Sequence, residues 1–147
     1  MKLKNQAIAT NLIDRVTIRV RFSEVDSMRV VWHGEYVKYF EDGRESFGKK
    51  YDLEYLNVHA KGYTIPFVSL KCEYKSSLRV GDTAIVETRF LDCEAAKIKF
   101  AYTVYRESDM VIAAEGESVQ VFLNNNGELE LTMPLFFIEW KKLRGLL

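Results

Sequence analysis

The side chains of this sequence that could do chemistry are concentrated in residues 21–45, which read RFSEVDSMRVVWHGEYVKYFEDGRE. An alternating strand pattern ends there in a loop that contains Asp26, and His33 follows where an aromatic helix begins. A carboxylate beside the N-terminus of a buried helix suits attack on a polarised carbonyl. The acid can activate a water molecule, while free helix N–H groups hold the developing oxyanion. We therefore expect the functional site around Asp26.

Two elements must position this loop. Alternation over residues 15–22 predicts a half-buried strand. Helical spacing predicts a helix over residues 33–47 that ends at Gly48. Gly43 lies inside that helix, where glycine is unfavourable, and its presence indicates the close approach of another backbone. The inner face of the strand is expected to present Val16, Ile18, Val20 and Phe22.

The rest of the chain predicts an α+β domain. A short helical turn is expected around residues 53–58, and Pro134 opens a final short helix. Tight turns join most of the remaining strands, so these strands should pair antiparallel, and one helix must cover one face of a five-stranded sheet. The four further strands are predicted over residues 64–77, 83–91, 96–106 and 110–123.

Composition narrows the class of protein. The chain has 147 residues and a formal net charge of +0, so we expect a single domain over residues 1–147 that binds neither nucleic acid nor a membrane. No apolar run is long enough to span a bilayer, and the basic N-terminus lacks the apolar stretch of a signal peptide, which predicts a cytoplasmic protein. The only two cysteines, Cys72 and Cys93, lie in no CxxC motif and near no clustered histidines. We therefore expect that they form neither a disulfide nor a metal site.

The order of elements and motifs resembles the hotdog fold, and within it the 4-hydroxybenzoyl-CoA thioesterase family with its bacterial YbgC-like acyl-CoA thioesterases. Asp26 falls on the catalytic acid of the family and His33 on its histidine. A second matched stretch runs from residues 65–69 through Glu73 and Tyr74 to the Gly81-Asp82 turn. The helix of the family matches Tyr36, Tyr39, Phe40, Glu41 and Arg44.

This resemblance, which covers residues 15–126, implies a five-stranded antiparallel sheet wrapped around one long helix. It also implies hydrolysis of an acyl or aroyl thioester without a cofactor, in a homodimer or homotetramer whose site lies between protomers. The substrate would be an acyl-CoA or, alternatively, an acyl-carrier protein. A rival interpretation is a non-catalytic module that binds acyl thioesters.

The resemblance implies specific roles near the acid. Asp26 would act as general base or as nucleophile; the alternative is a loop residue that caps the following helix. His33 would contact the thioester or tune Asp26, or it is an ordinary residue at a helix start. Backbone N–H groups from Trp32 to Gly34 would hold the carbonyl oxygen. Tyr36 is expected to line the acyl pocket.

Two further residues are expected to bind substrate from the long strand after the helix. Ser69 would line the site across a dimer interface. Lys71, in a row with Lys75 and Arg79, could meet the phosphates of CoA, although such a row is also typical of a solvated face.

The chain departs from the family at positions close to the acid. Phe22 stands where many relatives have tyrosine, so no phenol can orient Asp26 from there. Ser27, Met28 and Arg29 replace small or glycine-rich residues, and their volume predicts a narrowed or reshaped pocket.

Overall fold

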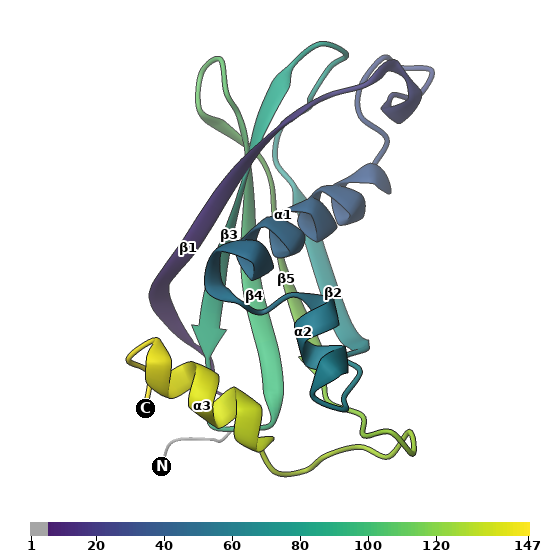
Figure 1. Ribbon diagram of the computed structural model, residues 1–147. Coiled ribbons are helices and arrows are strands. Elements are labelled where there is room, and N and C mark those ends of the chain that lie inside the picture. Colours follow the sequence, from purple (N-terminus) through teal and green to yellow (C-terminus); the bar gives the residue numbers. More distant parts are fainter. Residues whose placement is uncertain (1–5) are drawn as a thin grey trace.

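The computed structural model describes residues 6–147. Its five strands form one antiparallel sheet in the order β1-β3-β4-β5-β2, and the longest helix, α1, lies across one face of that sheet (Figure 1). This arrangement confirms the predicted α+β class. The elements are β1 Ile8–Arg19, a 3-10 turn Phe22–Glu24, α1 Glu35–Tyr51, α2 Tyr55–Ala60, β2 Phe67–Tyr74, β3 Thr83–Asp92, β4 Lys97–Arg106, β5 Val111–Val121 and α3 Leu135–Leu143.

The centre of the molecule is the aromatic face of α1. Its buried residues recur at the three- and four-residue spacing of a helix face, among them Tyr36, Phe40 and Phe47. Phe40 stacks on Tyr102 of β4 with ring centroids 4.5 Å apart. Gly43 faces β3, where an added Cβ would clash with the side chains of Thr88 and Val86. The expected close approach at Gly43 therefore exists, but it is to side chains of a strand and not to another backbone.

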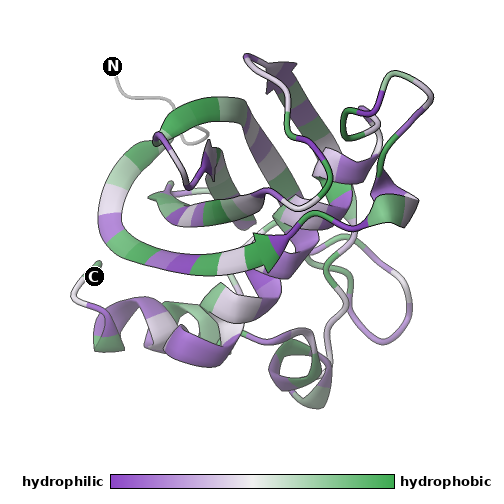
Figure 2. Cartoon of the chain, turned by 90° about the horizontal axis from the view of Figure 1, so that it is seen from above, coloured by the Kyte–Doolittle hydropathy of each residue, from purple (hydrophilic) through white to green (hydrophobic). Residues whose placement is uncertain are grey.

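Alternation along the strands provides the other half of the core. Figure 2 shows hydrophobic and hydrophilic bands that alternate along the strands, as expected for a sheet with one buried face. In β3 and β4 every second residue is buried, including Phe90 and Phe100. The last helix, α3, adds Phe137 and the buried Lys141, whose Nζ lies 2.7 Å from the Asp92 carboxylate and donates to the Cys93 carbonyl oxygen at 2.7 Å.

Two predicted boundaries were wrong for reasons that matter at the site. The first strand begins at Ile8 and ends at Arg19, and Phe22, expected on its inner face, is 85% exposed in the 3-10 turn. The chain leaves the sheet after Val20, whose N–H donates to the Asp82 carbonyl, so strand alternation no longer applies to Phe22. Helix α1 continues past Gly48 to Tyr51. Gly48 does not end the helix; it packs closely against the backbone of Leu53 and Glu54, where an added Cβ would clash.

Candidate active site

Asp26 lies at the beginning of a tight turn between the 3-10 helix and α1. Its N–H donates to the Val30 carbonyl and its carbonyl accepts from the Arg29 N–H, each at 2.9 Å, and a bridge between Val25 and Val31 closes the turn. Arg29, one of the three residues that follow the acid, adopts a left-handed conformation with φ 65°. The turn therefore holds the Asp26 backbone from both sides.

The Asp26 side chain is only partly constrained. Its Oδ1 accepts the Met28 N–H at 2.8 Å, whereas Oδ2 has no hydrogen-bond partner among residues 6–147. The N-cap of α1 is Gly34, and no side chain of residues 6–147 caps that helix. Asp26 thus stabilises its own turn, does not cap α1, and leaves one carboxylate oxygen available to a water or a carbonyl carbon.

Glu24 ties this turn to α1. Its Oε1 accepts the Arg21 N–H at 2.8 Å and the Tyr39 hydroxyl at 3.1 Å, and its carbonyl oxygen accepts the Trp32 N–H at 2.9 Å. Tyr39 is 1% exposed, and burial, together with the negative charge of Glu24, raises the pKa of its hydroxyl. The hydroxyl therefore remains protonated and continues to donate to Glu24.

The other side of the turn rests on the segment after β2. The Val31 N–H donates to the Leu78 carbonyl at 2.8 Å, and Val30 forms a bridge with Arg79. Leu78 is fully buried, which fixes this segment to the core. The Asp26 turn is consequently held between the end of β1, helix α1 and residues 75–82.

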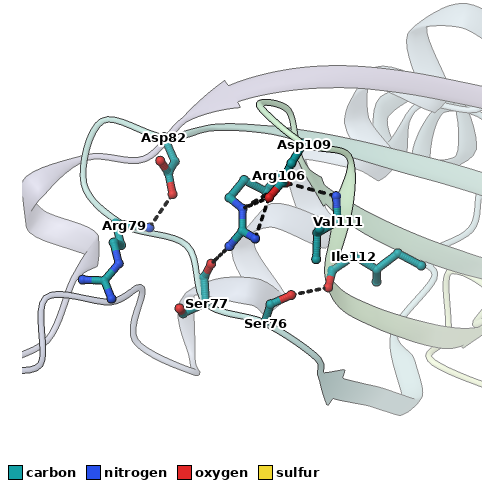
Figure 3. Close-up of polar contacts among 8 residues, drawn as sticks. All are labelled: Ser76, Ser77, Arg79, Asp82, Arg106, Asp109, Val111 and Ile112. Atoms are coloured by element: carbon teal, nitrogen blue, oxygen red, sulfur yellow. Dashed lines mark hydrogen bonds and ion pairs between the residues drawn. The ribbon is translucent and has the colours of Figure 1, made fainter.

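A polar network secures residues 75–82 in turn (Figure 3). Arg106, the last residue of β4, donates from Nη1 to the Ser77 carbonyl at 2.8 Å and pairs with Asp109 at 2.9 Å. The Arg79 N–H donates to the Asp82 carboxylate at 2.8 Å. These contacts connect the β4–β5 turn to the segment that supports the acid, so the position of Asp26 depends on strands distant in sequence.

The N-terminus of α1 offers two free backbone donors. Among residues 6–147, neither the His33 N–H nor the Gly34 N–H has a hydrogen-bond partner. The Trp32 N–H is engaged by Glu24, so it is not available to an oxyanion, and the expected set of donors narrows to the other two. The indole of Trp32 covers Gly34 closely enough that a Cβ there would clash with the ring. Free N–H groups at the positive end of a helix suit a developing negative charge.

The aromatic residues near this helix start differ in exposure. His33 is exposed, with its ring 4.8 Å from that of Trp32, and no hydrogen bond or ion pair between described residues joins it to Asp26. Tyr36 is buried beneath the helix start, and burial raises its pKa to about 12. Its ring meets the edge of Tyr74 at 5.3 Å. Glu24, Tyr39 and Tyr74 were not expected to act at the site, because nothing in their spacing indicates which distant groups they reach.

Ser69 and Lys71 do not join this group within one chain. They are exposed on β2 and pair with Val119 and Glu117 of β5, whereas Gly116, the neighbour of Glu117 on that strand, faces Phe40 of α1. Since neighbouring positions on a strand point to opposite faces, Ser69 and Lys71 lie on the face of the sheet away from α1.

Two cavities of the single chain lie close to α1, and neither contains the candidate acid. One cavity of about 940 Å³ lies between the end of β1 and α1, and one of about 550 Å³ lies beside the C-terminal half of α1. Neither Asp26 nor His33 lines either cavity. The smaller one is bordered by Arg44, whose guanidinium lies 4.2 Å from the ring centre of Phe67.

Two kinds of feature are absent from residues 6–147. No three His, Cys, Asp or Glu side chains in this range are grouped so that they could hold a metal ion. No helix in the same range combines the length and the apolar character needed to cross a membrane.

Comparison with known proteins agrees with this geometry. The thioesterase-like superfamily matches residues 20–140. The Bacillus subtilis (strain 168) protein named "Putative acyl-CoA thioesterase YneP" is 32% identical over 93 residues, which cover 63% of this chain and 67% of that protein.

Two solved structures share the fold. The hypothetical protein TT1821 from Thermus thermophilus has a TM-score of 0.77 at 29% identity and covers 88% of this chain and 97% of its own. A variant of 4-hydroxybenzoyl-CoA thioesterase in complex with 4-hydroxybenzoyl-CoA has a TM-score of 0.75 at 20% identity, over 88% of this chain and 98% of its own. The resemblance expected from the sequence is confirmed: this chain belongs to the thioesterase-like superfamily and is a thioester hydrolase with the hotdog fold.

Proposed function

We propose that this protein hydrolyses CoA thioesters of acyl or aroyl groups. In this proposal Asp26 activates the attacking water or attacks the carbonyl carbon itself. One observation carries the proposal. The free Asp26 oxygen belongs to a turn that leads within a few residues into the unpartnered N–H groups of His33 and Gly34. The name of the Bacillus relative supports the choice of CoA as the thiol.

The chemistry follows from these groups. In the general-base route, water loses a proton to Asp26 as its oxygen bonds to the thioester carbon, and the carbonyl oxygen becomes an oxyanion held by the His33 and Gly34 N–H groups. The C–S bond then breaks, and the thiolate takes up the proton. In the nucleophilic route, a carboxylate oxygen of Asp26 bonds to the carbonyl carbon, the C–S bond breaks and the thiolate leaves with a proton from solvent. Water then hydrolyses the mixed anhydride to the free acid and the Asp26 carboxylate. General-base catalysis contributes roughly 10²–10⁴ in rate, and one oxyanion donor contributes about 3–4 kcal/mol.

We further propose that a second copy of the chain completes the site. Strand β2 is an edge of the sheet, and its exposed residues include the apolar Val68 and Leu70. A long apolar edge tends to pair with another strand. Pairing of two copies there, in a dimer or a dimer of dimers, would also bring Ser69 and Lys71 near the site of the other protomer.

The activity is tested by thiol release over a panel of acyl-CoAs of increasing chain length plus an aroyl-CoA, with matched acyl-carrier proteins. Turnover of CoA thioesters that falls at least about 10²-fold in Asp26→Asn supports the proposal. Faster turnover of carrier-protein thioesters than of CoA thioesters would mean that the thiol of the substrate is the carrier protein and not CoA. Tight binding of every thioester without thiol release would favour the non-catalytic module.

Assembly is tested by light scattering at micromolar concentration, with Leu70→Lys as the edge variant and Lys97→Glu, on the interior strand β4, as the control for a change of charge. We expect a dimer or larger species for the wild type and the control, and a shift towards monomer with loss of activity for Leu70→Lys. A fully active wild-type monomer would contradict a shared site.

A further inference from the structure

Tyr74, the last residue of β2, reaches the helix start from the edge of the sheet. Its hydroxyl donates to the carbonyl oxygen of His33 at 2.8 Å, across 41 residues of sequence. Its ring also meets Tyr36 edge-on at 5.3 Å, which fixes the direction of the phenol against a buried side chain. This hydrogen bond is a tertiary contact at the N-terminus of α1, which no side chain in the described part of the chain caps.

The His33 carbonyl and the Gly34 N–H belong to the same peptide group. A peptide group is planar and trans, so its C=O and N–H point in opposite directions and rotate together. A donor that holds the carbonyl on one side therefore fixes the direction of the N–H on the other side. The Gly34 N–H is one of the two unpartnered donors, so nothing else among residues 6–147 fixes its direction by a hydrogen bond.

We propose that Tyr74 is a positioning residue for catalysis, which holds the His33–Gly34 peptide so that the Gly34 N–H points at the oxyanion of the thioester. The inference rests on the proposed function. A hydrogen bond to the carbonyl also polarises the peptide and strengthens its N–H as a donor. Both effects act most strongly where negative charge develops, that is, in the transition state.

The state of the phenol is compatible with this role. Tyr74 is 52% exposed, yet its pKa is raised above the ordinary value. Partial burial is the larger cause, and the nearby Cys72 thiol is the second. The hydroxyl therefore stays protonated at neutral and mildly alkaline pH.

The test replaces Tyr74 by Phe, which keeps the ring and its packing on Tyr36. Complete loss of an oxyanion donor costs roughly 10²–10³ in kcat, and a donor that is present but misdirected should cost about tenfold or more. We expect that fall in kcat with KM changed by less than about threefold. The matched control is Tyr105→Phe on β4, whose hydroxyl has no hydrogen-bond partner among residues 6–147 and which should behave as the wild type.

A spectroscopic measurement separates positioning from a general structural effect. A substrate analogue in which a methylene replaces the thioester sulfur keeps the carbonyl but cannot be hydrolysed. With an isotope label on that carbonyl, its infrared stretch should move to lower frequency on binding to the wild type and to Tyr105→Phe. The shift should be smaller in Tyr74→Phe at equal saturation.

The outcomes distinguish the two proposals. An active wild type, together with a Tyr74→Phe variant of equal kcat and equal carbonyl shift, would overturn the role of Tyr74 and leave the proposed function intact. A wild type that releases no thiol from any thioester would overturn the proposed function, and the role of Tyr74 with it.

Discussion

Replacement of Asp26 by Asn should remove the carboxylate to which we assign catalysis, while it preserves the turn. Oδ1 of Asp26 accepts the Met28 N–H at 2.8 Å, and the amide oxygen of Asn can accept the same bond. The bond becomes weaker because its acceptor is no longer charged, by about 1 kcal/mol or less. For a domain of this size that change lowers Tm by no more than about 4 °C.

The effect on catalysis should be much larger than the effect on stability. Asn cannot take the proton of water and is a poor nucleophile, so turnover should fall roughly 10²–10⁴-fold. This range corresponds to about 3–5 kcal/mol in the activation barrier. Two companion variants show whether the loss of turnover comes from the missing base or from a disturbed turn. Asp26→Ala should lose both activity and the turn hydrogen bond, and Asp26→Glu should keep a base that is displaced by a methylene and lose about 10²-fold.

The assay is steady-state thiol release, with a blank for the half-buried Cys72, and Tm is measured on the same samples. A single turnover in water labelled with a heavy oxygen isotope then separates the two routes. Labelled oxygen found in the Asp26 carboxylate itself requires an anhydride intermediate. Asp26→Asn with wild-type turnover and unchanged Tm would refute the assignment of the acid, whatever the other variants do.

Three further predictions concern the support of the site and its pocket. Tyr39→Phe removes the donor to Glu24 and should lower the free energy of unfolding by about 1–2 kcal/mol in urea titration, with a fall in kcat because the Asp26 turn loosens. Asp92→Asn leaves the buried Lys141 ammonium without its carboxylate and should cost about 3 kcal/mol, which the double variant with Lys141→Met should largely restore. Met28→Ala should raise kcat/KM for bulky acyl-CoAs relative to short ones by about tenfold, since one methylene of fit is worth roughly 1–3 kcal/mol.

Each of these has a result that counts against it. Unfolding of Tyr39→Phe at the wild-type urea concentration would mean that the contact to Glu24 contributes nothing. If Lys141→Met fails to rescue Asp92→Asn, the loss comes from packing and not from an uncompensated charge. An unchanged ratio of kcat/KM values would place the Met28 side chain away from the acyl group.

The sequence alone determined the features that depend on local periodicity. The buried faces of β3 and β4 follow from strict alternation, and the aromatic face of α1 follows from its helical spacing. The position of Asp26 between a strand and a helix could be read in the same way. These patterns survive folding because a strand or a helix with one apolar face has few ways to bury it.

Tertiary structure decided the features that depend on partners far along the chain. Phe22 is exposed because the chain leaves the sheet before it, and Ser69 lies on the face away from α1 because of its register with β5. The hydrogen bonds of Tyr39 to Glu24 and of Tyr74 to His33 join segments 15 and 41 residues apart. No local pattern encodes such contacts, since their partners become neighbours only when the sheet curls around α1. The sequence therefore indicated the candidate acid, whereas the fold decided which residues hold the turn and the helix start around it.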